Sequence, residues 1–190
     1  ARVCSTGSRS RSFLPENCRP AEVLEGPTLV LRRASSAYAD RLADALRASI
    51  PELRDFMDWA QDDPSESAAI DEFIRLADRD WAADKAYNFH TFDAASDTLV
   101  GSCGLMRRVG PDAIEIGYWI RSDHAGQGLA TEAAAILADA AWDLYGIERI
   151  VIRHDLANAA SGRVAEKLGF IEIDRVAVEV TAEGLSLIHI

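Results

Sequence analysis

A pair of glycines between an apolar strand and an alanine-rich helix constrains this chain more than any other feature. The strand is predicted over residues 113–120 and the helix over residues 129–144, and Gly126 and Gly128 lie in the loop that joins them. Glycine lets a backbone approach a bulky anion, and the start of a helix presents unpaired N–H groups and the positive end of its dipole. A Gly-x-Gly pattern alone is weak evidence, but the strand before it and the helix after it predict a ligand that carries phosphate groups.

The rest of the chain predicts a mixed sheet with helices on both faces. Strand patterns cover residues 28–33, 87–92, 98–107, 113–120, 149–154 and 170–181, and helical patterns cover residues 38–49, a segment from Pro51 to Trp59, about 65–85, 129–144 and 158–168. The N-terminal strands favour antiparallel pairing, whereas the later strand–helix–strand units favour crossovers. We therefore predict an α+β fold whose central mixed sheet is mostly antiparallel.

A single domain accounts for the length of the chain. The 190 residues, of which 48% are hydrophobic, suffice for one core, and we assign residues 27–185 to it. Residues 1–26 show neither helical nor strand periodicity, so we expect them to be disordered and assign them no function, although an organelle transit peptide has a similar composition. Residues 186–190 are predicted to be a tail, either a short substitute for a last strand or the rest of a truncated one.

Charge and cysteine content limit the partners. The formal net charge of −11 disfavours nucleic acid and anionic membranes, so we expect neither as a partner, and we expect a monomer or a homodimer. Cys4, Cys18 and Cys103 are widely spaced and odd in number, which predicts no disulfide framework and fits a cytoplasmic setting. The four histidines show no ligand spacing, so we predict no metal.

Three motifs occur in an order that indicates a family. They are Glu115-Ile-Gly-Tyr-Trp119, then Gly126-x-Gly128-x-Ala130-Thr131-Glu132, and then Asn158-x-x-Ser161 running into Glu166-Lys-Leu-Gly-Phe170. Together they resemble the GNAT N-acetyltransferases, in particular the branch that acetylates the N-termini of ribosomal proteins. The resemblance implies that acetyl-CoA donates its acetyl group directly to a primary amine in a ternary complex. The acceptor that we expect is the α-amine of a protein or peptide.

The same resemblance implies which residues hold acetyl-CoA. The N–H groups expected on its pyrophosphate belong to Gly126, Gln127, Gly128, Leu129, Ala130 and Thr131. Ile120 and Arg121 would pair with the pantetheine arm through main-chain groups. The family's usual Arg or Gln side chain at the phosphates is missing, because Ala125 occupies its place. Asn158 and Ser161 would contact the cofactor arm, although capping a helix is the commonest task of an Asn at such a site.

Candidate catalytic residues follow from the chemistry of amide formation, which needs a neutral amine and a proton for the departing thiolate. Glu115 is the candidate base, acting through water, and the alternative is a solvated residue on the open face of a sheet. Many relatives use a Tyr as the acid where this chain has Ala165, so Ser161 becomes the candidate acid and Tyr118 the reserve. Glu179 is a remote further candidate.

Phe56, Trp59 and Trp119 are candidates for lining the acceptor slot, although aromatic residues at such spacing are more often part of a core. Two other functions also fit the glycine loop. A Rossmann-type oxidoreductase that binds NAD(P) would have a similar strand–glycine–helix unit, but Thr131 replaces the third glycine of that fingerprint. A non-catalytic sensor of acyl-CoA would keep the phosphate site without turnover.

Overall fold

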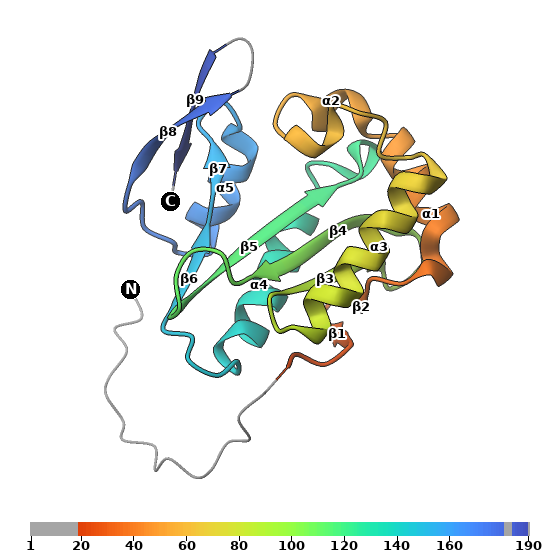
Figure 1. Cartoon of the computed structure of the whole chain (residues 1–190), viewed down its shortest axis with the longest axis horizontal. Helices are drawn as coiled ribbons and strands as arrows, with labels where there is room; N and C mark the ends of the chain where they lie inside the picture. The colour runs from red at the N-terminus through yellow and green to blue at the C-terminus, as the bar shows by residue number, and fades with distance from the viewer. Residues whose placement is uncertain (1–18, 181–183, 190) are drawn as a thin grey trace.

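The computed structural model describes residues 19–180 and 184–189, and a six-stranded sheet forms its centre (Figure 1). The strands are neighbours in chain order: β1 (Val23–Glu25), β2 (Leu29–Arg33), β3 (Ala86–Asp93), β4 (Leu99–Met106), β5 (Ala113–Ile120) and β6 (Arg149–Ile152). Pairing is antiparallel from β1 to β5, and β6 pairs parallel with β5. The predicted mixed and mostly antiparallel sheet is therefore confirmed.

Helices cover both faces of this sheet. They are α1 (Ala39–Arg47), α2 (Ile50–Arg54), α3 (Ser67–Ala82), α4 (Leu129–Trp142) and α5 (Ala159–Lys167), with short 3-10 turns η1 (Ser36–Tyr38), η2 (Asp58–Ala60) and η3 (Ser122–His124). In Figure 1, α3 crosses in front of the sheet and α4 lies behind it. One core cluster joins α4 to the sheet, and a second joins α1 and α3 to Phe92 and Leu99.

A row of small and branched residues fixes α4 against the sheet. Leu129, Ala133, Leu137 and Ala141 recur every four residues, so they share one face of the helix, and all are buried. They belong to the same core cluster as Ile114 and Ile116, the alternate residues of β5 that point to this side. The first turn of α4 is thereby held beside the end of β5.

The sheet divides after β6. β5 and β6 pair only as far as Ile116 opposite Ile152, and the chain then turns into β7 (His154–Asp155). β7 belongs to a second sheet, in which β9 (Gly184–His189) lies between β7 and β8 (Arg175–Val180) and is antiparallel to both. Within the described residues, no strand pairs with this edge of β5 from Gly117 to Ile120, so the strand has an open edge there.

Several boundaries differ from those predicted. β1 falls inside the segment expected to be disordered, because residues 23–25 pair with β2, while residues 1–18 lie outside the described part. α2 ends at Arg54, whose Nε donates to the carbonyl of Ala60 at 3.0 Å and closes the turn toward η2. β9 continues to His189 into the predicted tail, which agrees with the option of a short substitute strand. β8 begins five residues later than predicted.

The strand pairing also argues against one alternative function. A Rossmann-type domain is built on a sheet of parallel strands, whereas the main sheet here contains one parallel pair, β5 with β6, among the described residues. The prediction of an NAD(P)-binding oxidoreductase is therefore not supported by the fold. None of the helices in the described part is both long enough and apolar enough to cross a membrane.

Candidate active site

A cavity of about 400 Å³ opens where β5 loses its partner strand. Its walls come from the end of β5, the loop through Gly126 and Gly128, the start of α4, one side of α5, and α2 with the residues that follow it. Figure 1 places α2 and α5 at different sides of the end of β5. The cavity is therefore a consequence of the divergence between the two sheets.

The glycine loop lies at this cavity with both glycines in the left-handed region. Gly126 has a φ of +77° and Gly128 a φ of +85°, and a Cβ on either would meet no atom within 4 Å. The first helical hydrogen bond runs from the N–H of Glu132 to the carbonyl of Gly128 at 3.0 Å. The N–H groups of Leu129, Ala130 and Thr131 therefore precede the hydrogen-bonded ladder of α4, and all three residues line the cavity.

Glu132 anchors this first turn to the N-terminal part of the sheet. Its carboxylate accepts hydrogen bonds from the N–H groups of Thr28 and Leu29 at 2.7 and 3.0 Å, and from the hydroxyl of Thr28 at 2.5 Å. A carboxylate in the first turn also interacts favourably with the helix dipole. The sequence motif contains Glu132, but only the fold shows that it fastens the phosphate loop to the start of β2.

The 3-10 turn η3 connects the loop to α2. The N–H of Ser122 donates to the hydroxyl oxygen of Ser49 at 3.1 Å, and the hydroxyl of Ser122 donates to Glu52 at 2.8 Å. Next to it, Nδ1 of His124 lies 2.8 Å from the carboxylate of Asp123. The hydrogen bond with His124 is the largest of the effects that hold the pKa of Asp123 below its usual value. Ser122, His124 and Glu52 all line the cavity.

Tyr118 and Ser161 bring two hydroxyl groups together inside the cavity. The hydroxyl of Tyr118 lies 3.0 Å from that of Ser161, and it is 3.3 Å from the carbonyl oxygen of the same residue. Burial raises the pKa of Tyr118, and the bond with Ser161 opposes that rise. Because the phenol stays protonated at neutral pH, the pair can carry a proton to a nearby anion.

Asn158 holds the start of α5. Its side-chain oxygen accepts a hydrogen bond from the N–H of Ser161 at 3.0 Å, which is a helix cap. The predicted capping role is confirmed. Asn158 also lines the cavity, so the cap leaves its amide nitrogen available to a ligand.

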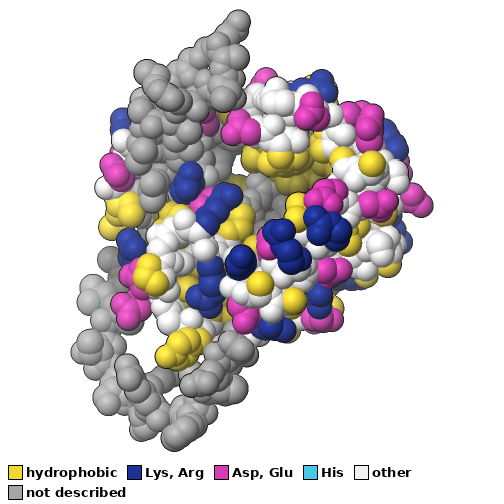
Figure 2. All heavy atoms as spheres, in the orientation of Figure 1, with side chains coloured by type: hydrophobic (Ala, Val, Ile, Leu, Met, Phe, Trp, Pro, Cys, Tyr) yellow, Lys and Arg dark blue, Asp and Glu magenta, His cyan; other side chains and the backbone are white. Residues whose placement is uncertain are grey.

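An apolar wall closes the other side of the cavity. It consists of Leu53, Phe56, Met57 and Trp119. Phe56 is 40% exposed although it is aromatic, so the cavity accounts for its position better than a core would. Figure 2 shows hydrophobic side chains on the wall of a hollow below the α2 region. Trp59 does not line the cavity among the described residues, but its ring lies 6.4 Å from that of Trp119.

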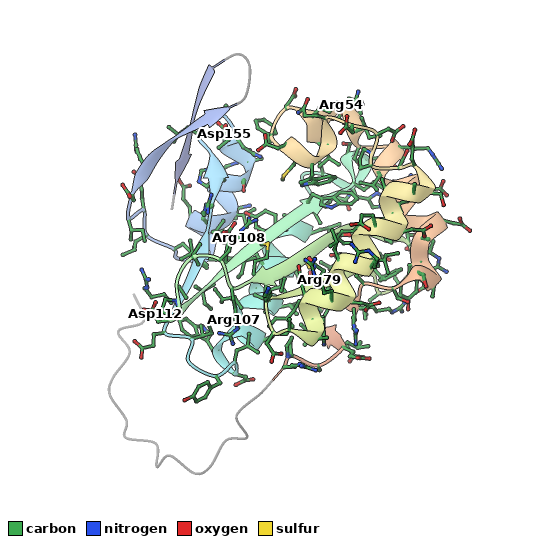
Figure 3. All side chains as sticks on the ribbon, viewed as in Figure 1. Arg54, Arg79, Arg107, Arg108, Asp112 and Asp155 are labelled. Carbon is green, nitrogen blue, oxygen red and sulfur yellow. The ribbon has the colours of Figure 1, made fainter. Side chains whose placement is uncertain are left out.

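Glu115 is buried, and it is not among the described residues that line the cavity. It alternates with Ile114 and Ile116, so it lies on the opposite face of β5 as predicted, but only 3% of it is exposed. Arg108 donates to both of its carboxylate oxygens, at 2.9 and 2.6 Å, and Arg153 lies 3.6 Å away. Figure 3 labels Arg108 in front of β5. The alternative of a solvated Glu115 is wrong.

The predicted site residues thus divide into two groups. Those that line the cavity are Phe56, Tyr118, Trp119, Ile120, Gly126, Gly128, Leu129, Ala130, Thr131, Asn158 and Ser161, whereas Trp59, Glu115, Arg121 and Gln127 are not in its described lining. The N–H of Arg121 donates to the carbonyl of Val100 at 2.8 Å, so this group is not free to pair with a pantetheine arm. By strand alternation, the main-chain groups of Tyr118 and Ile120 face the open edge instead.

The cavity also contains ionisable residues that no sequence motif indicates. Glu52, His124, Arg163 and Lys167 line it. The helical spacing of Arg163 and Lys167 after Asn158 is visible in the sequence, but nothing there shows that this side of the helix faces a cavity. Within residues 19–180 and 184–189, no group of three or more His, Cys, Asp or Glu residues is placed to hold a metal ion.

Comparisons with known proteins agree with this geometry. Residues 28–171 match the model of the family described as "Acetyltransferase (GNAT) domain". "Probable N-acetyltransferase YjcK" of Bacillus subtilis is 35% identical over 89 residues, which cover 46% of this chain and 49% of that protein, so the match spans about half of its length. "Putative ribosomal N-acetyltransferase YdaF" of the same organism is 25% identical over 76% of this chain and 78% of that protein.

A solved structure shows the same fold. The ribosomal L7/L12 α-N-protein acetyltransferase RimL, determined in complex with coenzyme A, superposes with a TM-score of 0.77 at 21% identity, and the match covers 88% of this chain and 96% of that one. Since the family model also covers more than half of the residues, the sequence and the fold lead to the same assignment. This chain belongs to the GNAT acetyltransferase domain family.

Proposed function

We propose that this protein is an N-acetyltransferase that moves the acetyl group of acetyl-CoA to a primary amine. One observation carries the proposal: a single cavity joins the free N–H groups at the start of α4, the open edge of β5 and the hydroxyl pair of Tyr118 and Ser161. These are the parts needed to hold a diphosphate, to align a chain of amides and to protonate a thiolate.

Acetyl-CoA would lie along the cavity in a defined direction. Its pyrophosphate would accept hydrogen bonds from the loop and from the first turn of α4, which offers the positive end of the helix dipole. Its pantetheine amides would pair with the open edge of β5 at Tyr118 and Ile120, as an added strand would. Asn158 would donate its amide nitrogen to the same arm. The thioester would then lie near Ser161.

The chemical step would use the hydroxyl pair as the acid. As the acceptor nitrogen attacks the thioester carbon, the carbon–sulfur bond breaks and the departing thiolate needs a proton. Ser161 would donate it and recover one from Tyr118, 3.0 Å away. The proton that the acceptor nitrogen loses on forming the amide would pass to water, and water would return a proton to Tyr118. Both hydroxyls remain protonated at neutral pH, and burial raises the pKa of Tyr118 further. Ser161 is therefore the proposed acid and Tyr118 its proton source.

The base remains a prediction. Glu115 would have to act through water from outside the described lining, and both of its oxygens already accept hydrogen bonds from Arg108. A protein α-amine, with a pKa of about 8, is partly neutral at pH 7 and demands little of a base, whereas a lysine amine of about 10.4 demands more. Because Glu115 is poorly placed to act as a base, an N-terminal α-amine is a more suitable acceptor than a lysine side chain.

We propose the N-terminal α-amine of a protein or peptide as the acceptor. Two observations support it: the names of YdaF and RimL refer to ribosomal protein acetylation, and the wall of Leu53, Phe56 and Met57 offers apolar surface to a side chain beside the amine. A cytoplasmic location belongs to the same proposal, and the buried free thiol of Cys103 in the described part supports it.

Thiol release tests the function. Purified protein is mixed with acetyl-CoA and a panel of peptides, amino acids and polyamines, and free coenzyme A is measured. We expect release that depends on peptides with an unblocked N-terminus, and none with the same peptides after N-acetylation. Tight binding of acetyl-CoA without release for any amine would instead identify a sensor.

A further inference from the structure

One side of α5 carries two cations along the cavity. Ala160, Arg163, Val164 and Lys167 all line it, and their spacing of three, four and seven residues places them on one face of the helix. At a rise of about 1.5 Å per residue, this row extends for roughly 10 Å. Ser161 lies at the N-terminal end of the row, so the two cations lie farther from the hydroxyl pair.

Among residues 19–175, whose side chains the structure describes, neither Arg163 nor Lys167 has an ion-pair or side-chain hydrogen-bond partner, whereas Arg108 and Arg121 each bind a carboxylate. This is unexpected in a chain with 31 acidic and 20 basic residues. Lys167 lies in the last turn of α5, where the helix dipole stabilises a positive charge. Two like charges four residues apart nevertheless destabilise a helix, and a bound anion would offset that cost.

The cations share their cavity with the proposed phosphate loop. α5 contacts α4, and Val164 belongs to the same core cluster as Leu129 in the first turn of α4. These residues line one cavity, together with Gly126 and Gly128. The main-chain N–H groups of the loop can serve the pyrophosphate by themselves. Arg163 and Lys167 are therefore left for a further anionic group beyond it.

We propose that Arg163 and Lys167 form a subsite for the 3′-phosphate of coenzyme A, a proposal that rests on the function proposed above. The 3′-phosphate is carried by the ribose next to the pyrophosphate, it has a charge near −2 at neutral pH, and it has no main-chain donor assigned to it. The fork of Arg163 suits two phosphate oxygens, and the ammonium of Lys167 adds a point charge. The subsite would select coenzyme A over its analogue with a free 3′-hydroxyl.

Calorimetric titration with coenzyme A and with 3′-dephospho-coenzyme A tests the subsite. The native protein should bind coenzyme A about tenfold more tightly, which corresponds to one or two solvent-exposed charge-assisted hydrogen bonds. The double variant Arg163→Gln with Lys167→Gln should bind both ligands within about twofold of each other, by weakening coenzyme A alone. Arg163→Lys should retain part of the preference, since it keeps the charge but loses the fork.

Lys85→Gln is the matched control, because Lys85 is an exposed lysine outside the described lining of the cavity, and it should leave the preference unchanged. Equal affinity of the native protein for the two ligands would overturn the subsite but not the proposed function. An equal loss of both ligands in the double variant would also overturn it, because the cations would then serve the pyrophosphate or the helix. Failure of the native protein to bind either ligand would overturn the proposed function itself.

Discussion

The two walls of the cavity are built in different ways. The wall made by the phosphate loop and α4 presents main-chain N–H groups, and it is fixed by buried helix contacts and by the hydrogen bonds of Glu132 to Thr28 and Leu29. The wall made by α2 and the residues that follow it presents the side chains of Leu53, Phe56 and Met57, and Phe56, which comes after the helix, is 40% exposed. The first wall can bind only a group that accepts hydrogen bonds from these fixed N–H groups. The ligand that the second wall can bind depends on which side chains the sequence places there.

This difference separates a wall whose function depends on backbone conformation from one whose function depends on the identity of its side chains. A diphosphate can be held by any chain whose backbone adopts the loop conformation, so only glycine positions are constrained there. An acceptor is selected by the size and polarity of side chains. We therefore expect substitutions in the loop to affect every acetyl-CoA-dependent property, and substitutions in α2 or in the residues after it to affect the acceptor alone.

The largest effect is expected from Gly128→Glu. The new residue would have to adopt a φ of +85° and would place a carboxylate at the proposed diphosphate site. Calorimetric titration should show affinity for coenzyme A reduced by more than about 100-fold. Gly146→Glu is the matched control, because Gly146 has a φ of +75° with open space around it and is not in the described lining of the cavity. Unchanged affinity in Gly128→Glu would contradict the proposed cradle.

Ser161→Ala should reduce kcat by about 100-fold while the Kd for coenzyme A changes little, since a general acid acts on the chemical step. Tyr118→Phe should have a smaller effect, because water can replace the second hydroxyl. Steady-state rates of both single variants and of the double variant test their coupling. A double variant no slower than Ser161→Ala indicates one proton path, whereas multiplied effects would show that the two hydroxyls act independently.

Phe56→Ala tests the acceptor wall, which is the apolar side of the cavity formed by Leu53, Phe56 and Met57. Removing the ring should raise the KM for a peptide acceptor about tenfold, through lost apolar contact, and leave the Kd for coenzyme A unchanged. Tyr145→Ala removes a more exposed aromatic ring, 65% accessible, outside the described lining, and should change neither constant. A change in coenzyme A affinity without a change in acceptor KM would reverse the assignment of the two walls.

Glu115→Gln should give the smallest effect on activity. If Glu115 is the base, turnover falls several-fold near pH 7, where most of an α-amine of pKa about 8 is protonated, and recovers above pH 9, where the amine is neutral. The measurement is kcat/KM between pH 6 and 10. A profile parallel to that of the native protein would assign Glu115 to the ion pair with Arg108 instead.

The sequence predicts the wall made by the phosphate loop and α4 better than it predicts the acceptor wall, and the reason is physical. The bounds of β5 and the start of α4 agree with the prediction, because alternating apolar residues and glycines specify local conformation directly. The role of Asn158 as a cap was equally local. These features need no knowledge of distant contacts.

Other features depend on contacts between distant residues. β1 forms because β2 supplies a partner, and the buried carboxylate of Glu115 forms ion pairs with Arg108 and Arg153. α2 is short because the chain turns after Arg54, whose side chain donates a hydrogen bond to the carbonyl of Ala60. The cavity itself arises because β7 leaves the main sheet to pair with β9, which no local pattern indicates. Arg163 and Lys167 were overlooked for the same reason.

A crystal structure of this protein with coenzyme A would show whether the main chain of the loop holds the diphosphate. We expect the pyrophosphate oxygens to lie within hydrogen-bonding distance of the N–H groups between Gly126 and Thr131, with the pantetheine arm along the open edge of β5. Coenzyme A bound elsewhere, or a diphosphate held by side chains without these N–H groups, would rule out the proposed phosphate site.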